Sequence, residues 1–403
     1  MMNQKPASRA SFLRRICTRP GLWITALLLC VCVVFSILTF LLPKKEFSEK
    51  ENRALAQLPV LSADTLKDGS FARGAEKFFA DQFFRRDFWT ALNLRRLTAF
   101  RQKESGGVYL GRHRQLYLIP GETNEAALAR NLSAMETFAG RYPGVKSFAA
   151  IIPNAVEVQP KNLPRNAPVP DQAAQLEAIA KKLPTVQWID TLPVLRERAD
   201  EYLYYMTDHH WTSFGASVAF QAIASKMGIT PVKDYDIYEV SRSFRGTLAA
   251  KSGRANAKDR VELYVPKTEI DYYVTYTESA KKAGTMYETS ALEARDHYTV
   301  FFGGNHPRVD VATTAETGRT LLLLKDSYAN CMMQFLYPNF EKIIMIDPRY
   351  FYESADMLMQ QNHITDVLYL YNLDTFLADT SLADVLAVPT VPAGSAPITP
   401  DKQ

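Results

Sequence analysis

The chain has 403 residues, of which 47% are hydrophobic and 22% are charged, as is usual for a globular protein of one large domain or two. The formal net charge is only +4, from 47 basic and 43 acidic residues, which argues against a dedicated nucleic-acid-binding protein. Three of the four cysteines lie within or beside one apolar segment, so the rest of the chain, where Cys331 stands alone, has no disulfide framework.

Residues 21–42 form an uncharged run rich in Leu, Val, Ile, Phe and Cys. A helix of this length crosses a bilayer core of roughly 30 Å. Residues 1–20 carry five basic side chains and no acidic one, so the positive-inside rule predicts a cytoplasmic tail and an extracytoplasmic chain from Pro43 onward. A cleaved signal peptide would have a shorter apolar region and a small-x-small cleavage site, which this segment lacks. The sequence therefore favours an uncleaved, single-pass membrane anchor.

Residues 43–110 are predicted to be an extracytoplasmic accessory region. Over residues 64–100, aromatic side chains recur at helical spacing between charges, which predicts a helical layer packed on the main domain. Residues 106–111 have the pattern of a strand between two turns.

Residues 111–387 are predicted to form the main domain, because apolar strands alternate there with helices. The strands are apolar on both faces, which is typical of a mainly parallel, doubly wound α/β sheet. In chain order the predicted elements are a helix at 124–140, a strand at 147–152, a helix at 171–182, a strand at 186–189, a helix at 213–227, a strand at 319–324, a helix at 328–336, a strand at 342–346, a helix at 353–362 and a strand at 366–371.

Two segments of the chain depart from this alternation. An insert rich in charge and tyrosine, at about residues 229–318, is expected to be irregular. Residues 388–403 are rich in Pro, Thr and Ala and are predicted to be a disordered tail.

Two polar motifs lie at the ends of predicted strands or loops. Ser327, in Lys-Asp-Ser-Tyr, follows an apolar strand and precedes a helix, so its hydroxyl would lie beside free N–H groups at the edge where doubly wound sheets carry their sites. His210, in Asp-His-His-Trp, lies just ahead of a helix that Thr212 can cap. A serine hydroxyl needs a base to take its proton, and a carboxylate can orient that base. The sequence therefore predicts a serine-type acyl-transfer site formed by Ser327, His210 and Asp208.

Each motif also has a plainer interpretation. In isolation, Ser327 is more typical of a helix cap, and the Asp-His-His-Trp segment is equally typical of a polar turn with a half-buried histidine. A metal site of Asp208, His209 and His210 is disfavoured, because adjacent residues rarely chelate one ion well and no further ligand pair accompanies them. We therefore expect neither a metal ion nor a cofactor.

The Asp208-His-His-Trp motif resembles the signature of the DHHW family of bacterial proteins. Five other segments are similar to that family in style and order, at residues 47–53, 81–85, 107–111, 302–307 and 325–328. The resemblance covers roughly residues 45–375. The family is similar to the alginate O-acetyltransferases, which are SGNH-hydrolase-like proteins. This similarity implies that Asp208, His210 and Ser327 are the catalytic residues.

The resemblance to SGNH hydrolases also implies a rotated order of strands. In those enzymes the serine strand comes first and the Asp/His segment last, whereas here Ser327 follows the Asp208/His210 segment. The expected fold is therefore a circularly permuted, SGNH-hydrolase-like (flavodoxin-like) sheet. In this order Asn372 becomes the expected oxyanion-hole residue. Two departures are the Asp-x-His spacing and the lack of a glycine equivalent after Ile346.

Four further residues are candidate substrate contacts, namely Tyr328, Arg349, Trp211 and Asn305. Arg349 and Asn305 follow predicted strand or turn positions, and Trp211 could stack on a sugar ring. The alternatives are a structural salt bridge for Arg349, a plain turn for Asn305 and packing beneath the histidine loop for Trp211.

The expected function is extracytoplasmic O-acetylation of a cell-surface polysaccharide through an acyl-enzyme. The resemblance implies a multi-pass membrane acyltransferase as acetyl donor, since no acetyl-CoA pool exists outside the cell. Two alternatives remain open at this point. One is a polysaccharide acetylesterase, and the other is a non-catalytic, membrane-tethered protein that binds or assembles polysaccharide.

Overall fold

The structure, a computed structural model, describes residues 20–48, 53–99, 102–254 and 257–387. It divides into two compact units, Met1–Arg101 and Gln102–Gln403. The predictions of a cytoplasmic tail and of a disordered C-terminal tail lie outside the described residues.

The first unit contains the apolar helix α2 (Pro20–Leu41). Its segment Gly21–Leu41 is the single candidate membrane span within the described ranges, by length and composition. Three helices follow in the region predicted to be helical, α3 (Ala63–Lys67), α4 (Ser70–Gln82) and α5 (Arg86–Ala99). The short strands β1 (Phe47–Ser48) and β2 (Arg53–Ala54) pair antiparallel.

The second unit is built on a sheet of eight strands, counted over the described residues, in the order β11-β10-β12-β14-β13-β15-β6-β7. From β14 to β7 neighbouring strands run parallel, and β12, β10 and β11 extend this sheet antiparallel. The predicted mixed α/β fold with a mainly parallel sheet is confirmed. The strands are β6 (Lys146–Ile152), β7 (Gln187–Trp188), β10 (Tyr272–Tyr276), β11 (Lys281–Ala283), β12 (Arg308–Thr313), β13 (Thr320–Lys325), β14 (Lys342–Ile346) and β15 (Asp366–Asn372).

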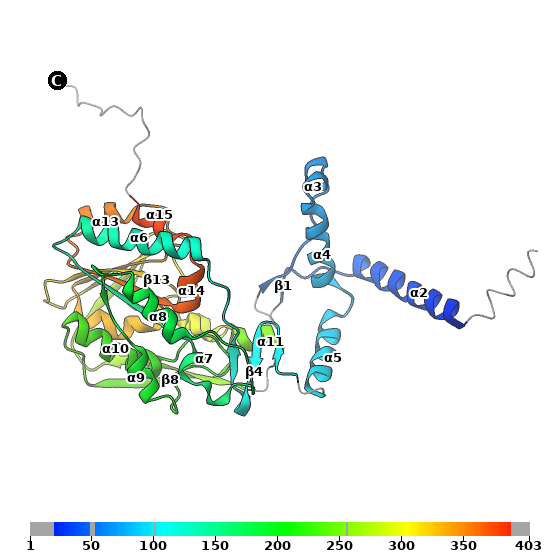
Figure 1. The fold of residues 1–403 in the computed structure, drawn as a ribbon, viewed down its shortest axis with the longest axis horizontal. Helices are drawn as coiled ribbons and strands as arrows, with labels where there is room; N and C mark the ends of the chain where they lie inside the picture. Colours follow the sequence, from blue (N-terminus) through cyan, green and yellow to red (C-terminus); the bar gives the residue numbers. More distant parts are fainter. Residues whose placement is uncertain (1–19, 49–52, 100–101, 255–256, 388–403) are drawn as a thin grey trace, which may run out of the picture. The chain divides into compact units, whose positions relative to one another are not determined.

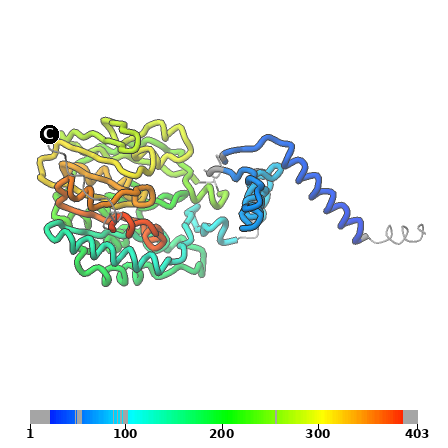
Figure 2. Tube along the Cα trace, turned by 90° about the horizontal axis from the view of Figure 1, so that it is seen from above, coloured from blue at the N-terminus to red at the C-terminus, as the bar shows by residue number. Residues whose placement is uncertain are grey.

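Helices cover both faces of this sheet (Figure 1). On one side lie α6 (Glu125–Arg141), α13 (Ala355–Gln361) and α15 (Leu382–Leu386), and on the other lie α9 (Leu192–Glu197) and α10 (Ser213–Met227). In both views α15, near the end of the described chain, lies beside α6 (Figures 1 and 2). The remaining helices are α7 (Ala155–Val158), α8 (Gln172–Lys181), α11 (Thr247–Ser252), α12 (Tyr328–Leu336) and α14 (Leu373–Ala378).

The central strand β13 shows why the core forms here. Its residues Leu321, Leu322, Leu323 and Leu324 are all fully buried, although successive side chains point to opposite faces. A strand covered on both faces needs an unbroken apolar run, and this run is the pattern that predicted a parallel sheet.

The prediction that residues 229–318 are irregular is wrong. Strands β8 (Tyr235–Phe244) and β9 (Asp259–Pro266) form an antiparallel ribbon, and β10, β11 and β12 belong to the main sheet. Many β8 side chains are exposed, so this strand lacks the buried apolar run that marks the central strands. A further three-stranded sheet contains β3 (Glu104–Ser105), β4 (Val108–Leu110) and β5 (Leu116–Leu118).

Helix α10 fixes the loop that carries His210. Thr212 is its N-cap and accepts a hydrogen bond from the Gly215 N–H at 3.0 Å, as predicted. The Thr212 N–H donates to the Leu203 carbonyl at 2.9 Å, and a Cβ on Gly215 would collide with that same carbonyl. The loop is therefore tied at its end to a close-packed helix start.

Candidate active site

The site begins at the carboxyl ends of three neighbouring parallel strands. Ser327 follows β13, Asn372 ends β15, and Asn154 follows β6. This edge is where open α/β sheets carry their ligands. Asp326 ties the first two ends together, because its carboxylate accepts from the Tyr328 N–H and the Asn372 N–H, both at 2.9 Å.

The three residues predicted to act together lie in hydrogen-bonding contact. His210 Nε2 is 2.8 Å from Ser327 Oγ, and His210 Nδ1 is 2.6 Å from Asp208 Oδ1. Asp208 and His210 are buried, and Ser327 is half-buried. When Nδ1–H donates to the carboxylate, Nε2 is left as an acceptor that faces the serine hydroxyl.

Asp208 lies in a pocket of donors that keeps it anionic. Its Oδ2 accepts from the Thr247 N–H at 2.7 Å and the Thr247 hydroxyl at 2.9 Å, and its Oδ1 accepts from the His210 N–H at 3.0 Å. Burial opposes the charge, but the adjacent His209 and His210 and these hydrogen bonds together hold the pKa of Asp208 below its ordinary value. The carboxylate can therefore stabilise an imidazolium at His210.

His209 occupies a neighbouring position rather than the centre of the cluster. Its Nδ1 is 2.7 Å from the Thr247 hydroxyl, and its ring centroid is 3.9 Å from that of His210. Burial, followed by the charge of His210, lowers the pKa of His209 to about 3. Asp208, His209 and His210 offer ligand atoms within 4.8 Å of one another, but an ion there would have to break the Asp208–His210 hydrogen bond.

Two residues that the sequence did not indicate also hold the cluster. The Tyr298 ring stacks on the His210 ring, with centroids 3.8 Å apart and planes 11° from parallel, and its hydroxyl donates to the Ser327 carbonyl at 2.8 Å. Buried Asp259 accepts from the backbone N–H groups of Met206 and Thr207, both at 2.8 Å. Both residues come from the insert, and neither lies in a motif that sequence reasoning could have singled out.

Asn372 is already engaged where it was predicted to donate to an oxyanion. Its Nδ2 donates to Asn154 Oδ1, and its Oδ1 accepts from the Asp374 N–H at 3.1 Å as the cap of α14. Asn154 donates in turn to Asp374 Oδ2 at 2.7 Å and lines a small cavity together with Asp208 and His209. An amide has two N–H donors, so Asn372 keeps one beyond this network.

The structure corrects two of the predicted substrate contacts. Trp211 is 0% and Tyr328 is 1% exposed, so neither ring has a face open to a sugar. The Trp211 indole N–H donates to the Tyr328 carbonyl at 3.0 Å, and the Tyr328 hydroxyl donates to the His209 carbonyl. Both side chains therefore pack beneath the histidine loop, the alternative that the sequence left open for Trp211.

The other two candidates, Arg349 and Asn305, belong to a polar network around a buried lysine. Arg349 makes two hydrogen bonds to Asp347, at 2.8 and 2.6 Å. Lys325 Nζ lies 3.5 Å from Asp347 and donates to Asn305 at 3.1 Å and Asn330 at 3.0 Å. Burial lowers the pKa of Lys325. Arg349 and Asn305 thus hold loops near Ser327, whatever else they contact.

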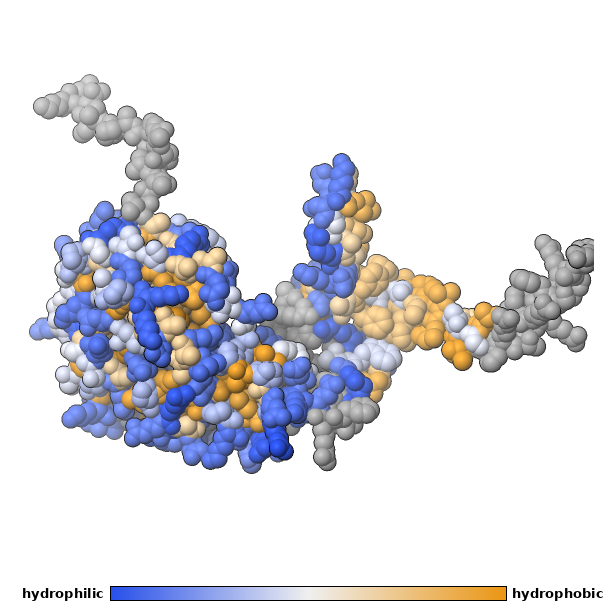
Figure 3. All heavy atoms as spheres, viewed as in Figure 1, coloured by the Kyte–Doolittle hydropathy of each residue, from blue (hydrophilic) through white to orange (hydrophobic). Residues whose placement is uncertain are grey.

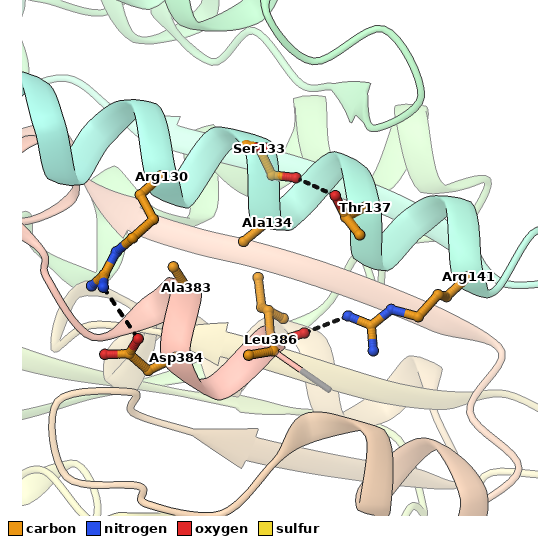
Figure 4. A pocket seen from close by; sticks show the side chains of 9 residues that line it. Arg130, Ser133, Ala134, Thr137, Arg141, Ala383, Asp384 and Leu386 are labelled. Carbon is orange, nitrogen blue, oxygen red and sulfur yellow. Dashed lines mark hydrogen bonds and ion pairs between the residues drawn. The ribbon is translucent and has the colours of Figure 1, made fainter. Parts of the chain in front are cut away.

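A larger hollow of about 430 Å³ lies between α6 and α15 (Figure 4). Arg130 and Arg141 point into it, and their partners across it are the Asp384 carboxylate and the Leu386 carbonyl. None of its lining residues belongs to the Asp208, His210 and Ser327 cluster. We therefore locate the candidate active site at the strand ends.

The chain is similar to known proteins in sequence and in fold. Residues 135–346, just over half of the chain, match the family model described as DHHW protein, so this chain belongs to the DHHW family. A crystal structure of a DHHW family protein from Eubacterium siraeum is 25% identical, with a TM-score of 0.61, and covers 70% of this chain and 95% of its own. No protein of the curated set matches the sequence.

Two further solved structures are more distant. Bacillus cereus PatB1, solved with a sulfonyl adduct, is 19% identical with a TM-score of 0.55, and the match covers 66% of this chain and 96% of PatB1. The O-acetyltransferase domain of Pseudomonas putida AlgJ is 16% identical with a TM-score of 0.43, over 69% of this chain and 94% of AlgJ. The likeness to PatB1 shows a shared fold, and the likeness to AlgJ is too loose to support an argument.

Proposed function

We propose that this chain is an extracytoplasmic, serine-type O-acetyltransferase that modifies a cell-surface polysaccharide. The observation that carries the proposal is the unbroken line of contacts from Asp208 through His210 to Ser327, at 2.6 and 2.8 Å. A buried carboxylate, an imidazole and a half-exposed hydroxyl in this order are the parts of a serine acyl-transfer site.

The proposed reaction has two halves. The Ser327 oxygen attacks the acetyl carbonyl of the donor while His210 Nε2 takes the hydroxyl proton. The bond to the donor's leaving group then breaks, His210 returns the proton to that group, and the acetyl group remains as an ester on Ser327. In the second half a sugar hydroxyl attacks the ester, His210 takes its proton, and the Ser327 oxygen leaves with that proton as the acetylated sugar departs.

Two donors are proposed for the oxyanion. The Ser327 N–H has no hydrogen-bond partner in the described part of the chain, and it stands at the start of α12. The second is the remaining N–H of Asn372, which ends the neighbouring strand β15. Losing one such donor typically costs about 3–4 kcal/mol of transition-state stabilisation.

Two exposed tyrosines favour a sugar polymer as acceptor. Tyr350 and Tyr352 follow β14, whose end is paired with the end of β13, and they are 45% and 92% exposed. Exposed aromatic rings stack on the apolar faces of sugars, so we propose that this loop contacts the polysaccharide. It takes the place of Trp211 and Tyr328 as the aromatic surface of the site.

The proposed location and donor follow from helix α2. With α2 as an anchor and the basic tail in the cytoplasm, the catalytic unit lies outside the cell, where no acetyl-CoA pool exists. A multi-pass membrane acyltransferase is then the proposed acetyl donor. Water in place of the sugar hydroxyl would make the same site an acetylesterase, which is the second candidate function.

We also propose that the sheet is a circularly permuted relative of the SGNH-hydrolase sheet. Strand β13 lies between β14 and β15, and β6 and β7, which come earlier in the chain, continue the parallel sheet beyond β15. A rotation of the chain order would bring the serine strand to the front. Superposing a crystal structure of this protein on an SGNH hydrolase, with strands matched out of sequence order, would test this relation.

The test uses the full chain in detergent and an activated acetyl ester. Wild type should release acetate, whereas Ser327→Ala and His210→Ala should not, and Ser133→Ala, a change of an exposed serine on α6, should match wild type. Equal acetate release by wild type and Ser327→Ala would contradict the proposal. An oligosaccharide acceptor followed by mass spectrometry separates transfer from hydrolysis. Tyr352→Ala should weaken transfer to the acceptor while leaving acetate release intact.

A further inference from the structure

The turn between α4 and α5 packs against the C-terminal half of α2. Its aromatic residues, here called the aromatic corner, are Phe78, Phe79, Phe83, Phe84, Phe88 and Trp89. Phe40 of α2 lies 5.4 Å from Phe79 and 5.9 Å from Phe78, measured between ring centroids. Phe35 of α2 contacts the rings of Phe83, Phe84 and Trp89 at 5.9, 5.6 and 5.9 Å.

These contacts set a depth along the candidate membrane span. Phe35 lies six residues before Leu41, the last residue of α2, which corresponds to about 9 Å of helix. A helix of 22 residues is about 33 Å long, close to the thickness of a bilayer core. If α2 spans the bilayer, a ring that touches Phe35 lies closer to the middle of the bilayer than the C-terminal end of α2 does. That depth is typical of side chains at the boundary between headgroups and acyl chains, which reaches roughly 5–10 Å.

Three backbone groups in the turn of the aromatic corner have partners within the protein, as a water-poor environment requires. The Phe84 N–H donates to the Thr39 hydroxyl of α2 at 3.1 Å, and Thr39 is 1% exposed. The Phe84 carbonyl accepts from the Trp89 indole at 3.1 Å, and the Phe83 carbonyl accepts from the Arg86 N–H at 2.9 Å. Turns in water can leave such groups to the solvent, whereas groups that enter a membrane must be satisfied internally.

A lysine side chain lies at the C-terminal end of α2, beside the Phe78 ring of the aromatic corner. Lys44 donates to the carbonyls of Thr39, Phe40 and Leu42, which a helix end otherwise leaves unpaired. Its ammonium also lies 5.9 Å from the ring centroid of Phe40. Lysine at the end of a span, beside aromatic rings, is typical of the headgroup level.

Near the aromatic corner, α5 has large apolar side chains that the described part of the chain leaves exposed. Phe88 is 56%, Trp89 39% and Leu92 45% exposed, so three large apolar side chains of α5 are exposed to solvent. In Figure 3 the apolar surface of α2 continues onto one side of α3 and α4, while their other side is hydrophilic. A soluble surface rarely leaves such side chains together without a partner.

We infer that the aromatic corner inserts into the outer leaflet, with Phe88, Trp89 and Leu92 in contact with lipid at the headgroup–acyl boundary. This inference rests on the proposed membrane span of α2 and is independent of the acetyl-transfer chemistry. The occupant is lipid because the aromatic corner is packed on the span itself. The chain is thereby held at the membrane by two elements, the span and the shallowly inserted aromatic corner.

The test measures depth in vesicles of phosphatidylcholine and phosphatidylglycerol, with the full chain carrying one environment-sensitive fluorophore at a time. In a background with Cys17, Cys30 and Cys32 changed to serine, the probe is placed at Phe88→Cys or at Glu76→Cys, an exposed position on α4. A third protein keeps Cys30 as the probe site within α2. Buried Cys331 stays unlabelled in the folded chain.

The probe at position 88 should emit at shorter wavelength and be quenched most by nitroxide lipids labelled near the headgroup. The probe at position 76 should be quenched by aqueous iodide and not by lipid, and the probe at Cys30 should be quenched most by deeply labelled lipids. If position 88 is as open to iodide as position 76 while Cys30 stays deep, the span stands and the inference is wrong. That outcome is also the one expected if the aromatic corner binds another membrane protein, since the vesicles contain none. If Cys30 is not quenched by lipid, both the span and the inference are overturned.

Discussion

Tyr298 has two contacts with the catalytic pair that can be separated by mutation. Its ring stacks on His210, and its hydroxyl donates to the Ser327 carbonyl at 2.8 Å. Tyr298→Phe keeps the ring and removes one hydrogen bond, which is worth about 0.5–1.5 kcal/mol, so turnover should fall by roughly 2- to 10-fold. Tyr298→Ala also removes the stack and should lower turnover much further. Acetate release and thermal unfolding are measured for both variants. Equal turnover in Tyr298→Phe and Tyr298→Ala would contradict a positioning role for the ring.

Asp296 offers a test of pH dependence near the same ring. Burial, followed by the negative charge of Asp208, raises the pKa of Asp296 to about 6, while His210 and Arg295 act in the opposite sense. Since the folded state then binds this proton more tightly than the unfolded state, stability falls as pH rises between about 4 and 6. Asp296→Asn stays neutral and can still accept from the Tyr298 N–H.

The melting temperature of wild type should therefore drop more steeply over this range than that of Asp296→Asn. Asp374, whose pKa burial also raises to about 6, is present in both proteins, so its contribution cancels in the difference. Parallel curves for the two proteins between pH 4 and 6 would show that Asp296 titrates normally.

The insert contacts Asp208 through Gly246 and Thr247. A Cβ on Gly246 would overlap the Asp208 side chain, and the glycine precedes Thr247, which donates two hydrogen bonds to Asp208. Gly246→Ala should push the carboxylate away from His210 and lower turnover by at least tenfold, since about 1.4 kcal/mol of lost orientation is enough for that. The matched control is Gly284→Ala in the same insert, where an added Cβ meets nothing within 4 Å. Acetate release is measured for both variants. Equal rates would mean that displacing the Asp208 carboxylate does not impair catalysis.

The helices and strands within the insert and after it differ in how well the sequence predicts them. Helix α12 and strand β14 were predicted with their observed bounds, because a buried apolar run between polar ends is a local signal. Strands β10 and β12 were missed because buried side chains alternate along them with half-buried or exposed ones, so neither has the unbroken apolar run that marks β13 and β14. Short alternating strands in a segment rich in charge are hard to tell from irregular chain.

The candidate site was likewise predicted only in part from the sequence. Asp208 and His210 lie two residues apart, so their contact was predictable, and the position of Ser327 at a strand end came from its flanking residues. The prediction that His210 contacts Ser327, which is 117 residues away, depended on the strand order that the family resemblance suggested. Tyr298 is 29 residues from Ser327 and stands in no motif, so only the folded structure brings it to His210.

The chain is predicted to keep its N-terminal helix α2 in the mature protein. If α2 is an anchor rather than a signal peptide, the protein in the membrane fraction should have the mass of the uncleaved chain, and proteases added to spheroplasts should remove everything beyond the span. Intact mass spectrometry of the extracted protein checks this. A soluble product that begins near residue 43 would instead identify a cleaved signal peptide.

Covalent labelling can show whether His210 and Asp208 activate Ser327, because it needs neither a sugar acceptor nor a donor protein. A sulfonyl fluoride reacts with an activated serine and spares ordinary hydroxyls. Incubated with phenylmethylsulfonyl fluoride, the full chain should gain one sulfonyl group, and peptide mapping should locate it on Ser327. Ser327→Ala should remain unlabelled, and Asp208→Asn should be labelled far more slowly, with a loss of about 10⁴-fold expected when such a carboxylate is replaced by an amide. No label on wild-type Ser327, or equal labelling rates in wild type and His210→Ala, would mean that His210 does not activate Ser327.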